Sequence, residues 1–203
     1  MIKITNFLFL VMFFSIFSVS LSGDEEMERV STKTAVVFNT LCAKCHEGQC
    51  SGRLSFDTGA EAADSHIRRY AGDTNISAGE TKDFFTLLNY MKKKCALYMP
   101  DNGRWKPENL SHFALPSHDG YFIPLGAMKS GSYSLNIETK EHVVFRVEVM
   151  SEHLDSLLYE SRCPDQEDQT FHFTIDEPVD AFLRIRSREP LHLTSLEIRK
   201  DEE

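Results

Sequence analysis

The chain has 203 residues, of which 22 are basic and 31 acidic, so its formal net charge is −9. This acidic balance argues against nucleic acid and anionic lipid as partners, because both are themselves negatively charged. It favours instead a protein partner that offers a basic docking face. The length allows one large domain or two small ones.

Residues 1–23 have the pattern of a secretory signal peptide. Lys3 supplies the positive charge, residues 7–17 are almost wholly apolar, and a tail of mostly small residues ends at Gly23. The apolar run is shorter than the roughly 20 residues that cross a bilayer. We therefore predict cleavage near Gly23 and a bacterial protein that is periplasmic or secreted, without membrane contact after cleavage. An uncleaved N-terminal anchor facing the periplasm is the alternative.

The segment from Met27 to about residue 114 has helical periodicity. Apolar residues at positions 30, 36–38 and 41 lie on one side of a segment that leads directly into Cys42. Asp57–Tyr70 and Gly79–Ala96 are predicted as further helices. After them, only Pro107–Phe113 is left to form another helix.

Cys42-Ala43-Lys44-Cys45-His46 is a Cys-x-x-Cys-His motif, which is typical of covalent haem attachment. The thiols of Cys42 and Cys45 are spaced to meet the two vinyl groups of a haem, and His46 is placed to ligate its iron. Export supports this interpretation, because bacteria attach haem covalently outside the cytoplasmic membrane. A zinc site would need a second cysteine pair, and a thioredoxin-like pair would need a preceding strand in a βαβ unit. The sequence offers neither, so it predicts one covalently bound haem c.

With this motif and the segment Leu97-Tyr98-Met99-Pro100, residues 24–115 resemble a class I c-type cytochrome. The resemblance implies an all-α haem domain in which a loop at residues 47–52 wraps the haem edge. It also implies that Met99 is the second axial ligand of the iron, opposite His46. The family usually has a full helix after this methionine, whereas only residues 107–113 remain for one here. The alternative ligands are Met91, His66, His112 and His118.

Three of the five cysteines remain outside the haem motif. Cys50 follows the motif and Cys95 precedes the segment of Met99, so both are expected to lie near the haem. A Cys50–Cys95 disulfide would fix the ligand segment in an oxidising compartment. Cys163 would then be a buried apolar residue or an intermolecular bridge. The alternative is that all three cysteines are reduced.

The periodicity changes from helical to alternating near residue 116, after two prolines and before the turn at Gly120. Six strand-like runs follow, at residues 121–125, 133–137, 142–149, 170–175, 181–186 and 191–198. They predict a second domain at residues 116–203, an all-β antiparallel sandwich. By its pattern this half resembles jelly-roll or pre-peptidase-like sandwiches, some of which bind sugars.

The predicted sandwich contains two clusters that are candidate sites. Three arginines fall on one face of a strand and either dock an acidic partner or form a solvated face paired with carboxylates. They are Arg184, Arg186 and Arg188, with Glu148, Glu177 and Asp180 as the candidate carboxylates. Three histidines in separate strands, His142, His172 and His192, form a candidate metal site if they converge.

Together these patterns predict a periplasmic monohaem c-type cytochrome that transfers single electrons between redox protein partners. The β-sandwich would serve in docking, and no catalytic residues are expected, because no nucleophile–base pair stands out. One alternative is a haem-based ligand sensor whose sixth iron position is open. Another is a β module that binds a glycan or a protein partner and carries the haem domain as an electron tap.

Overall fold

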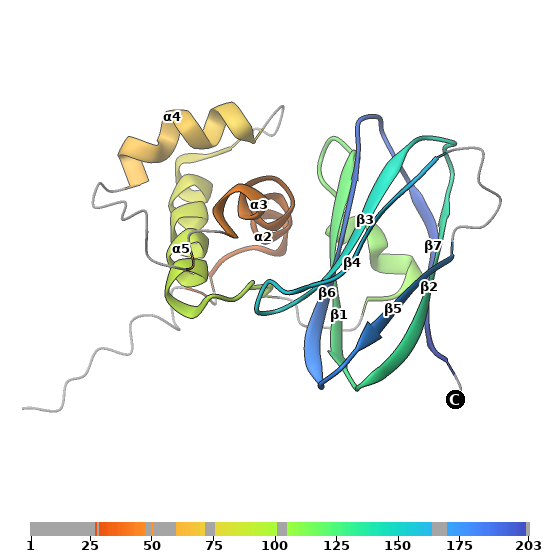
Figure 1. Cartoon of the computed structure of the whole chain (residues 1–203). Helices are drawn as coiled ribbons and strands as arrows, with labels where there is room; N and C mark the ends of the chain where they lie inside the picture. Colours follow the sequence, from red (N-terminus) through yellow and green to blue (C-terminus); the bar gives the residue numbers. More distant parts are fainter. Residues whose placement is uncertain are drawn as a thin grey trace, which may run out of the picture.

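The computed structural model describes residues 27, 29–47, 50, 60–71, 76–100, 105–163 and 170–201. Helices gather at one end of this part of the chain, and two antiparallel sheets form the other end (Figure 1). The predicted signal peptide lies outside the described residues, as does most of the predicted loop at residues 47–52. No helix of the described part has the length and apolar character needed to cross a membrane.

The helical end contains α2 (Thr32–Val37), α3 (Ala43–His46), α4 (Ala60–Tyr70) and α5 (Ala78–Lys94). A π-helical turn, η1 (Phe38–Cys42), joins α2 to α3, so the Cys-x-x-Cys-His motif ends one continuous helical segment. The hydroxyl of Ser31 caps the start of this segment by accepting a hydrogen bond from the Thr34 amide.

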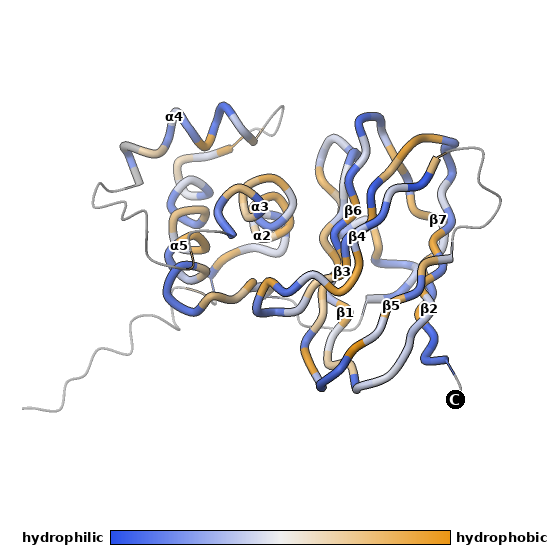
Figure 2. Tube along the Cα trace, in the orientation of Figure 1, coloured by the Kyte–Doolittle hydropathy of each residue, from blue (hydrophilic) through white to orange (hydrophobic). Residues whose placement is uncertain are grey.

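The long helix α5 begins with a capping box, in which Ser77 and Glu80 accept hydrogen bonds from each other's backbone amides. Its residues alternate between apolar and polar stretches from turn to turn (Figure 2). The apolar side, with Phe84, Leu87 and Met91, is buried. The helix ends at Cys95, whose backbone adopts a left-handed conformation with φ of 47°.

The sheets follow a short 3₁₀ helix, η3 (Pro107–Phe113). Their strands are β1 (Gly120–Met128), β2 (Gly131–Thr139), β3 (Phe145–Ser151), β4 (Ser156–Arg162), β5 (Thr170–Ile175), β6 (Val179–Ser187) and β7 (Leu193–Lys200). One sheet has the order β1-β6-β3-β4 and the other the order β5-β2-β7, with antiparallel pairing throughout. The predicted antiparallel sandwich is therefore confirmed. The sequence pattern missed β4, an edge strand in which only Leu158 is buried.

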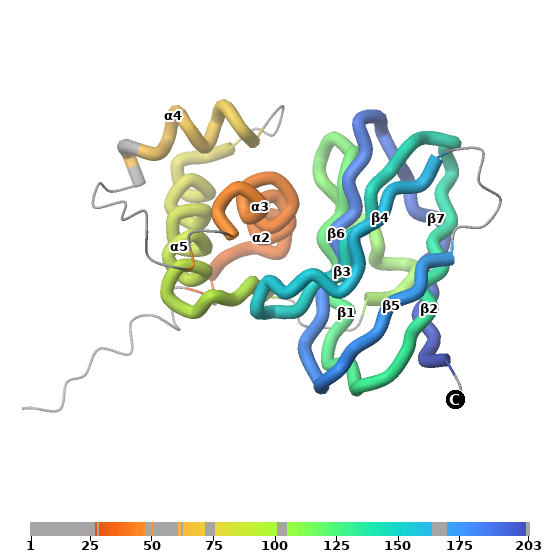
Figure 3. The backbone as a smooth tube through the Cα atoms, viewed as in Figure 1, coloured from red at the N-terminus to blue at the C-terminus, as the bar shows by residue number. Residues whose placement is uncertain are grey.

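The two faces of the first sheet are buried for different reasons. Leu183 and Ile185 of β6 point into the sandwich, where they pack with the buried residues of the second sheet, such as Leu135. The opposite face of β6 carries Arg184, which is also buried. The segment from α2 to α3 lies between α5 and this face, and it contacts both β1 and β6 (Figure 3).

The resemblance to class I c-type cytochromes, and the all-α haem domain that it implied, is wrong. The described chain holds only four α-helices beside a mostly β region. Among its described residues, no group of three or more His, Cys, Asp or Glu side chains lies together so as to hold a metal ion. The physical reason is the path of the chain. After Met99 the described residues form only η3 before β1, and the segment from α2 to η1 packs against β1 and β6 as well as against α5.

Candidate functional site

A cavity of about 420 Å³ lies between α4, α5 and the segment from η1 to α3. This volume falls within the roughly 300–1,000 Å³ typical of ligand pockets. Most of its walls are apolar or aromatic, formed by Phe38, Leu41, Ala63, Ile67, Tyr70, Phe84, Phe85 and Leu88. The remaining lining residues are Cys42, Cys45, His46 and His66. The cavity is thus an apolar pocket with two thiols and two imidazoles.

The Cys-x-x-Cys-His motif forms one wall of the cavity because of its helical conformation. Cys42 ends η1, and Cys45 and His46 lie three and four residues later, in α3. Side chains at this spacing share one face of a helix. The predicted attachment residues and the predicted iron ligand are therefore brought together on the same side of the pocket.

The Cys42 thiol is protonated at neutral pH. Burial, together with the neighbouring Cys45, raises the pKa of Cys42 to about 12. Cysteines that exchange disulfides have a pKa below the ordinary value, because the thiolate is the reactive form. Cys42 is therefore poorly suited to be the attacking thiol in thiol–disulfide exchange.

Helix α4 supplies the opposite wall. Ala63, His66, Ile67 and Tyr70 recur at intervals of three or four residues, so they share one face, and all four line the cavity. The ring centres of His46 and His66 are 6.2 Å apart, with 72° between the ring planes. The ring of Tyr70 lies 4.7 Å from that of His66 and is 58% exposed, an unusual position for a large aromatic side chain.

Polar contacts hold α4 against the start of α5. Asp64 accepts a hydrogen bond of 3.1 Å from the Thr81 hydroxyl and pairs at 2.8 Å with Arg68. Arg68 also donates to the carbonyl of Ile76, at 2.7 Å. The hydrogen bond from Arg68 holds the pKa of Asp64 below its usual range. The contacts fix the part of α4 on which His66 lies.

Met99, the ligand predicted from the resemblance, is buried in the core and is not one of the residues that line the cavity. Met91 is likewise a core residue, on α5. His112 is exposed on η3, and the ring of His118 stacks on that of His192 at 4.8 Å. Among the alternative ligands, only His66 lines the cavity that the described residues form.

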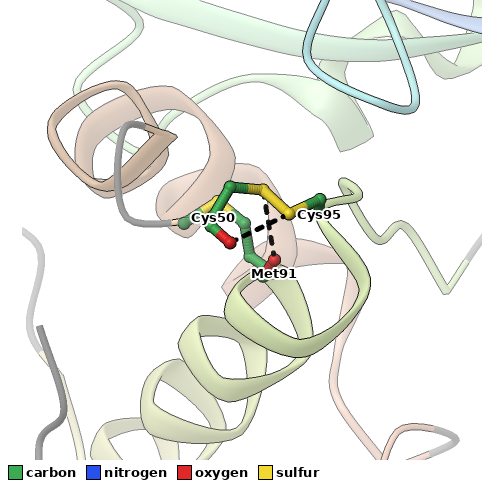
Figure 4. Close-up of a disulfide and its surroundings, with 3 residues drawn as sticks. All are labelled: Cys50, Met91 and Cys95. Carbon is green, nitrogen blue, oxygen red and sulfur yellow. Dashed lines mark hydrogen bonds between the residues drawn. A yellow bond between two sulfur atoms is a disulfide. The ribbon is translucent and has the colours of Figure 1, made fainter. Parts of the chain in front are cut away.

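Cys50 and Cys95 form a disulfide, with their Cα atoms 5.0 Å apart (Figure 4). The two residues are 45 positions apart, so the bridge closes a loop that contains α4 and α5, two of the walls of the cavity. The sulfur of Cys95 lies 3.2 Å from the carbonyl oxygen of Cys50, and the sulfur of Cys50 lies 3.8 Å from the carbonyl oxygen of Met91. Cys163 is exposed, which excludes the buried alternative.

The β-sheet positions the motif helix through an ion-pair network that the sequence pattern did not reveal. Arg184, with a side chain only 1% exposed, pairs with Glu148 at 3.0 Å and with Glu47, the residue directly after His46, at 2.5 Å. Lys44, within the motif, pairs with Glu148 at 3.4 Å. Arg186 donates to the carbonyl of Thr40 in η1. The predicted pairing with Glu148 is present, but Arg184 is buried and not part of a solvated face.

The three histidines predicted to lie in separate strands do not form the alternative metal site, and only His172 lies in a strand, whereas His142 precedes β3 and His192 precedes β7. His192 pairs with Glu141 at 2.7 Å and stacks on His118. In the described part of the chain, His142, His172 and His192 belong to no cluster of three or more side chains able to hold a metal ion.

No protein-family model matches the sequence, and a comparison with curated proteins also finds no match. The function is therefore argued from the residues of the cavity.

The residues present fit a covalently held haem. Two neighbouring thiols and an imidazole face one apolar cavity, as thioether attachment and axial ligation require. A porphyrin supplies four nitrogens to its iron, so the protein needs to add no more than one or two ligands. The absence of a three-residue metal cluster among the described residues is therefore compatible with this group.

Proposed function

We propose that the protein binds one haem covalently through Cys42 and Cys45, with His46 on the iron, and carries single electrons between protein partners. The observation that carries this proposal is the convergence of these three side chains on one apolar cavity of about 420 Å³. The high pKa of Cys42 also supports it, because it disfavours the competing role of a redox-active dithiol.

The side chains around the cavity have distinct roles in this proposal. Phe38, Phe84 and Leu88 exclude water from the interior, and the low polarity around an iron centre is one of the factors that set its reduction potential. Cys45 is exposed, so one edge of the site is close to solvent and within reach of a docked partner. The bound haem supplies a reversible one-electron iron couple.

The β-sandwich is proposed as the docking part, of the jelly-roll or pre-peptidase-like kind. Its sheet order supports this subclass, since β1 pairs with β6 and sequential strands alternate between the two sheets at β1–β2 and β2–β3. The net charge of −9 favours a partner with a basic face. The disulfide supports a location in the periplasm or outside the cell.

A spectroelectrochemical titration tests the proposal. The full chain is produced in a bacterial host that attaches haem c, alongside a Cys42→Ser/Cys45→Ser variant as the matched control. We expect the wild-type protein to hold haem and to titrate as a single one-electron couple, and the variant to fold with the same β-sheet signal but without bound haem. A wild-type protein that is folded and colourless contradicts the proposal.

A further inference from the structure

We propose that His66 of α4, and not Met99, is the second axial ligand of this haem, opposite His46. The inference rests on the proposed covalent haem and deepens it by assigning the ligand on the far side of the iron. The juxtaposition that carries it is the pair of imidazoles that line one cavity from α3 and α4, with ring centres 6.2 Å apart.

The separation of the two rings suits a shared metal ion. A metal–imidazole bond is about 2 Å long, and the ring centre lies about 1 Å beyond the nitrogen, so two imidazoles on opposite sides of one ion have centres roughly 6 Å apart. The centres of His46 and His66 are 6.2 Å apart. Rings that share such an axis can rotate about it independently, so the 72° between their planes is compatible with joint ligation.

Met99 does not line the cavity, and the two residues before it are fixed by hydrogen bonds to η1 and to the sheet region. The carbonyl of Tyr98 accepts a hydrogen bond of 2.9 Å from the Asn39 amide group, on η1. The amide of Leu97 donates to the carbonyl of Glu152, at 2.8 Å, just after β3. Met99 itself is 1% exposed in the core. The thioether is thus packed in the core and does not line the cavity.

His66, in contrast, lines the cavity and is exposed. Asp64 and Arg68, two residues to either side, fix α4 to the start of α5. The ring of Tyr70 packs against that of His66. The exposed Tyr70 ring and the exposed His66 side chain are both parts of the cavity wall that a bound haem would cover.

This ligation has two consequences. An imidazole in place of a thioether lowers the reduction potential, because methionine ligation is the arrangement that raises it. The iron would have both axial positions filled, so a gas molecule would have to displace His66. The inference therefore favours electron transfer over ligand sensing at the same site.

The test compares single variants of the haem-loaded full chain by absorption and electron paramagnetic resonance spectroscopy. We expect the ferric wild-type protein to be low-spin and to lack the weak far-red band of methionine–iron ligation. His66→Ala should become high-spin, and its ferrous form should bind carbon monoxide much faster than the wild-type protein does. His66→Met should gain the far-red band together with a higher reduction potential.

Met99→Leu is the matched control, since it removes the thioether and conserves the packing volume. We expect its spectra to be those of the wild-type protein. The inference is overturned if the wild-type protein has the far-red band and Met99→Leu loses it, or if His66→Ala stays low-spin. Absence of covalent haem from the wild-type protein overturns the proposed function as well, whereas a loaded protein indifferent to His66→Ala overturns the ligand assignment alone.

Discussion

Replacement of Arg184 by methionine removes the charge that joins the β-sheet to the haem-motif helix. The side chain of Arg184 is 1% exposed, and those of its partners Glu148 and Glu47 are 11% and 24% exposed. Methionine keeps most of the apolar stem, so the main loss is the ion pair. Removal of one partner from a buried pair costs about 3–5 kcal/mol. After the replacement, Glu148 keeps only the partly exposed Lys44, at 3.4 Å, as a partner among the described residues, and Glu47 loses its pairing with the buried Arg184.

This cost is large enough to measure by thermal unfolding. A destabilisation of 1 kcal/mol lowers Tm by about 2–4 °C in a protein of this size. Arg184→Met should therefore lower Tm by about 6–20 °C. Far-UV circular dichroism follows the sheets, and the fluorescence of the single tryptophan, Trp105, follows the junction between helices and sheets. Coincident transitions from the two probes justify a two-state analysis.

Two further variants separate the buried pair from a general charge effect. Arg199→Met is the matched control, because Arg199 is 72% exposed and pairs with Glu197 at the surface, where a pair contributes about 0–1 kcal/mol. In Arg184→Met/Glu148→Gln the charge of Glu148, which is then paired, among the described residues, with Lys44 alone, is also removed, so part of the lost stability should return. An Arg184→Met protein as stable as Arg199→Met refutes the reasoning.

Three other predictions concern the disulfide, the cap of α5 and the motif thiol. In the Cys50→Ser/Cys95→Ser variant the free energy of unfolding should fall by about 4 kcal/mol, because a cross-link between residues 45 positions apart is removed. Urea denaturation measures this change, and an unchanged midpoint and slope would contradict the prediction. Ser77→Ala should lower the free energy of unfolding by about 1 kcal/mol, because the N-cap of α5 is lost. The hydrogen bond from the Ser77 backbone amide lowers the pKa of Glu80 in the folded protein. The stabilisation by Glu80 should therefore be present above a pH of about 4.3 and be lost as the pH falls through the lowered pKa, which a measurement of stability against pH would show. In protein produced without haem, Cys42 should react with iodoacetamide at pH 8 at least roughly a hundredfold more slowly than free cysteine, because its pKa is about 12. Mass spectrometry of the labelled protein measures the rate, and a rate equal to that of free cysteine would argue against burial of this thiol.

Features with a local cause were predictable from the sequence. The spacing of Cys42, Cys45 and His46 puts them on one helical face whatever surrounds them, and the structure places them together. Ser77 and Glu80 sit three residues apart and cap α5. The alternation of apolar residues located six of the strands, and the edge strand β4 escaped because only one of its residues is buried.

Features with a tertiary cause were not predictable. Arg184 lies on the face of β6 that alternation assigns to solvent, and it is buried because the motif helix packs on that face. The resemblance to class I c-type cytochromes failed because the described chain packs its four α-helices beside a mostly β region. His66 lies on an apolar face of α4 by its spacing, but only the packing of α4 against α5 brings it opposite His46.

The intact mass of the denatured protein shows whether a haem is bound covalently to Cys42 and Cys45. The full chain is purified from a host that attaches haem c, fully reduced, denatured, and weighed intact beside Cys42→Ala/Cys45→Ala. The account predicts a wild-type mass equal to the polypeptide plus one haem, with no alkylatable thiol at Cys42 or Cys45, and a variant mass equal to the polypeptide alone. A wild-type mass without haem, from cells in which a control cytochrome is fully loaded, would contradict it.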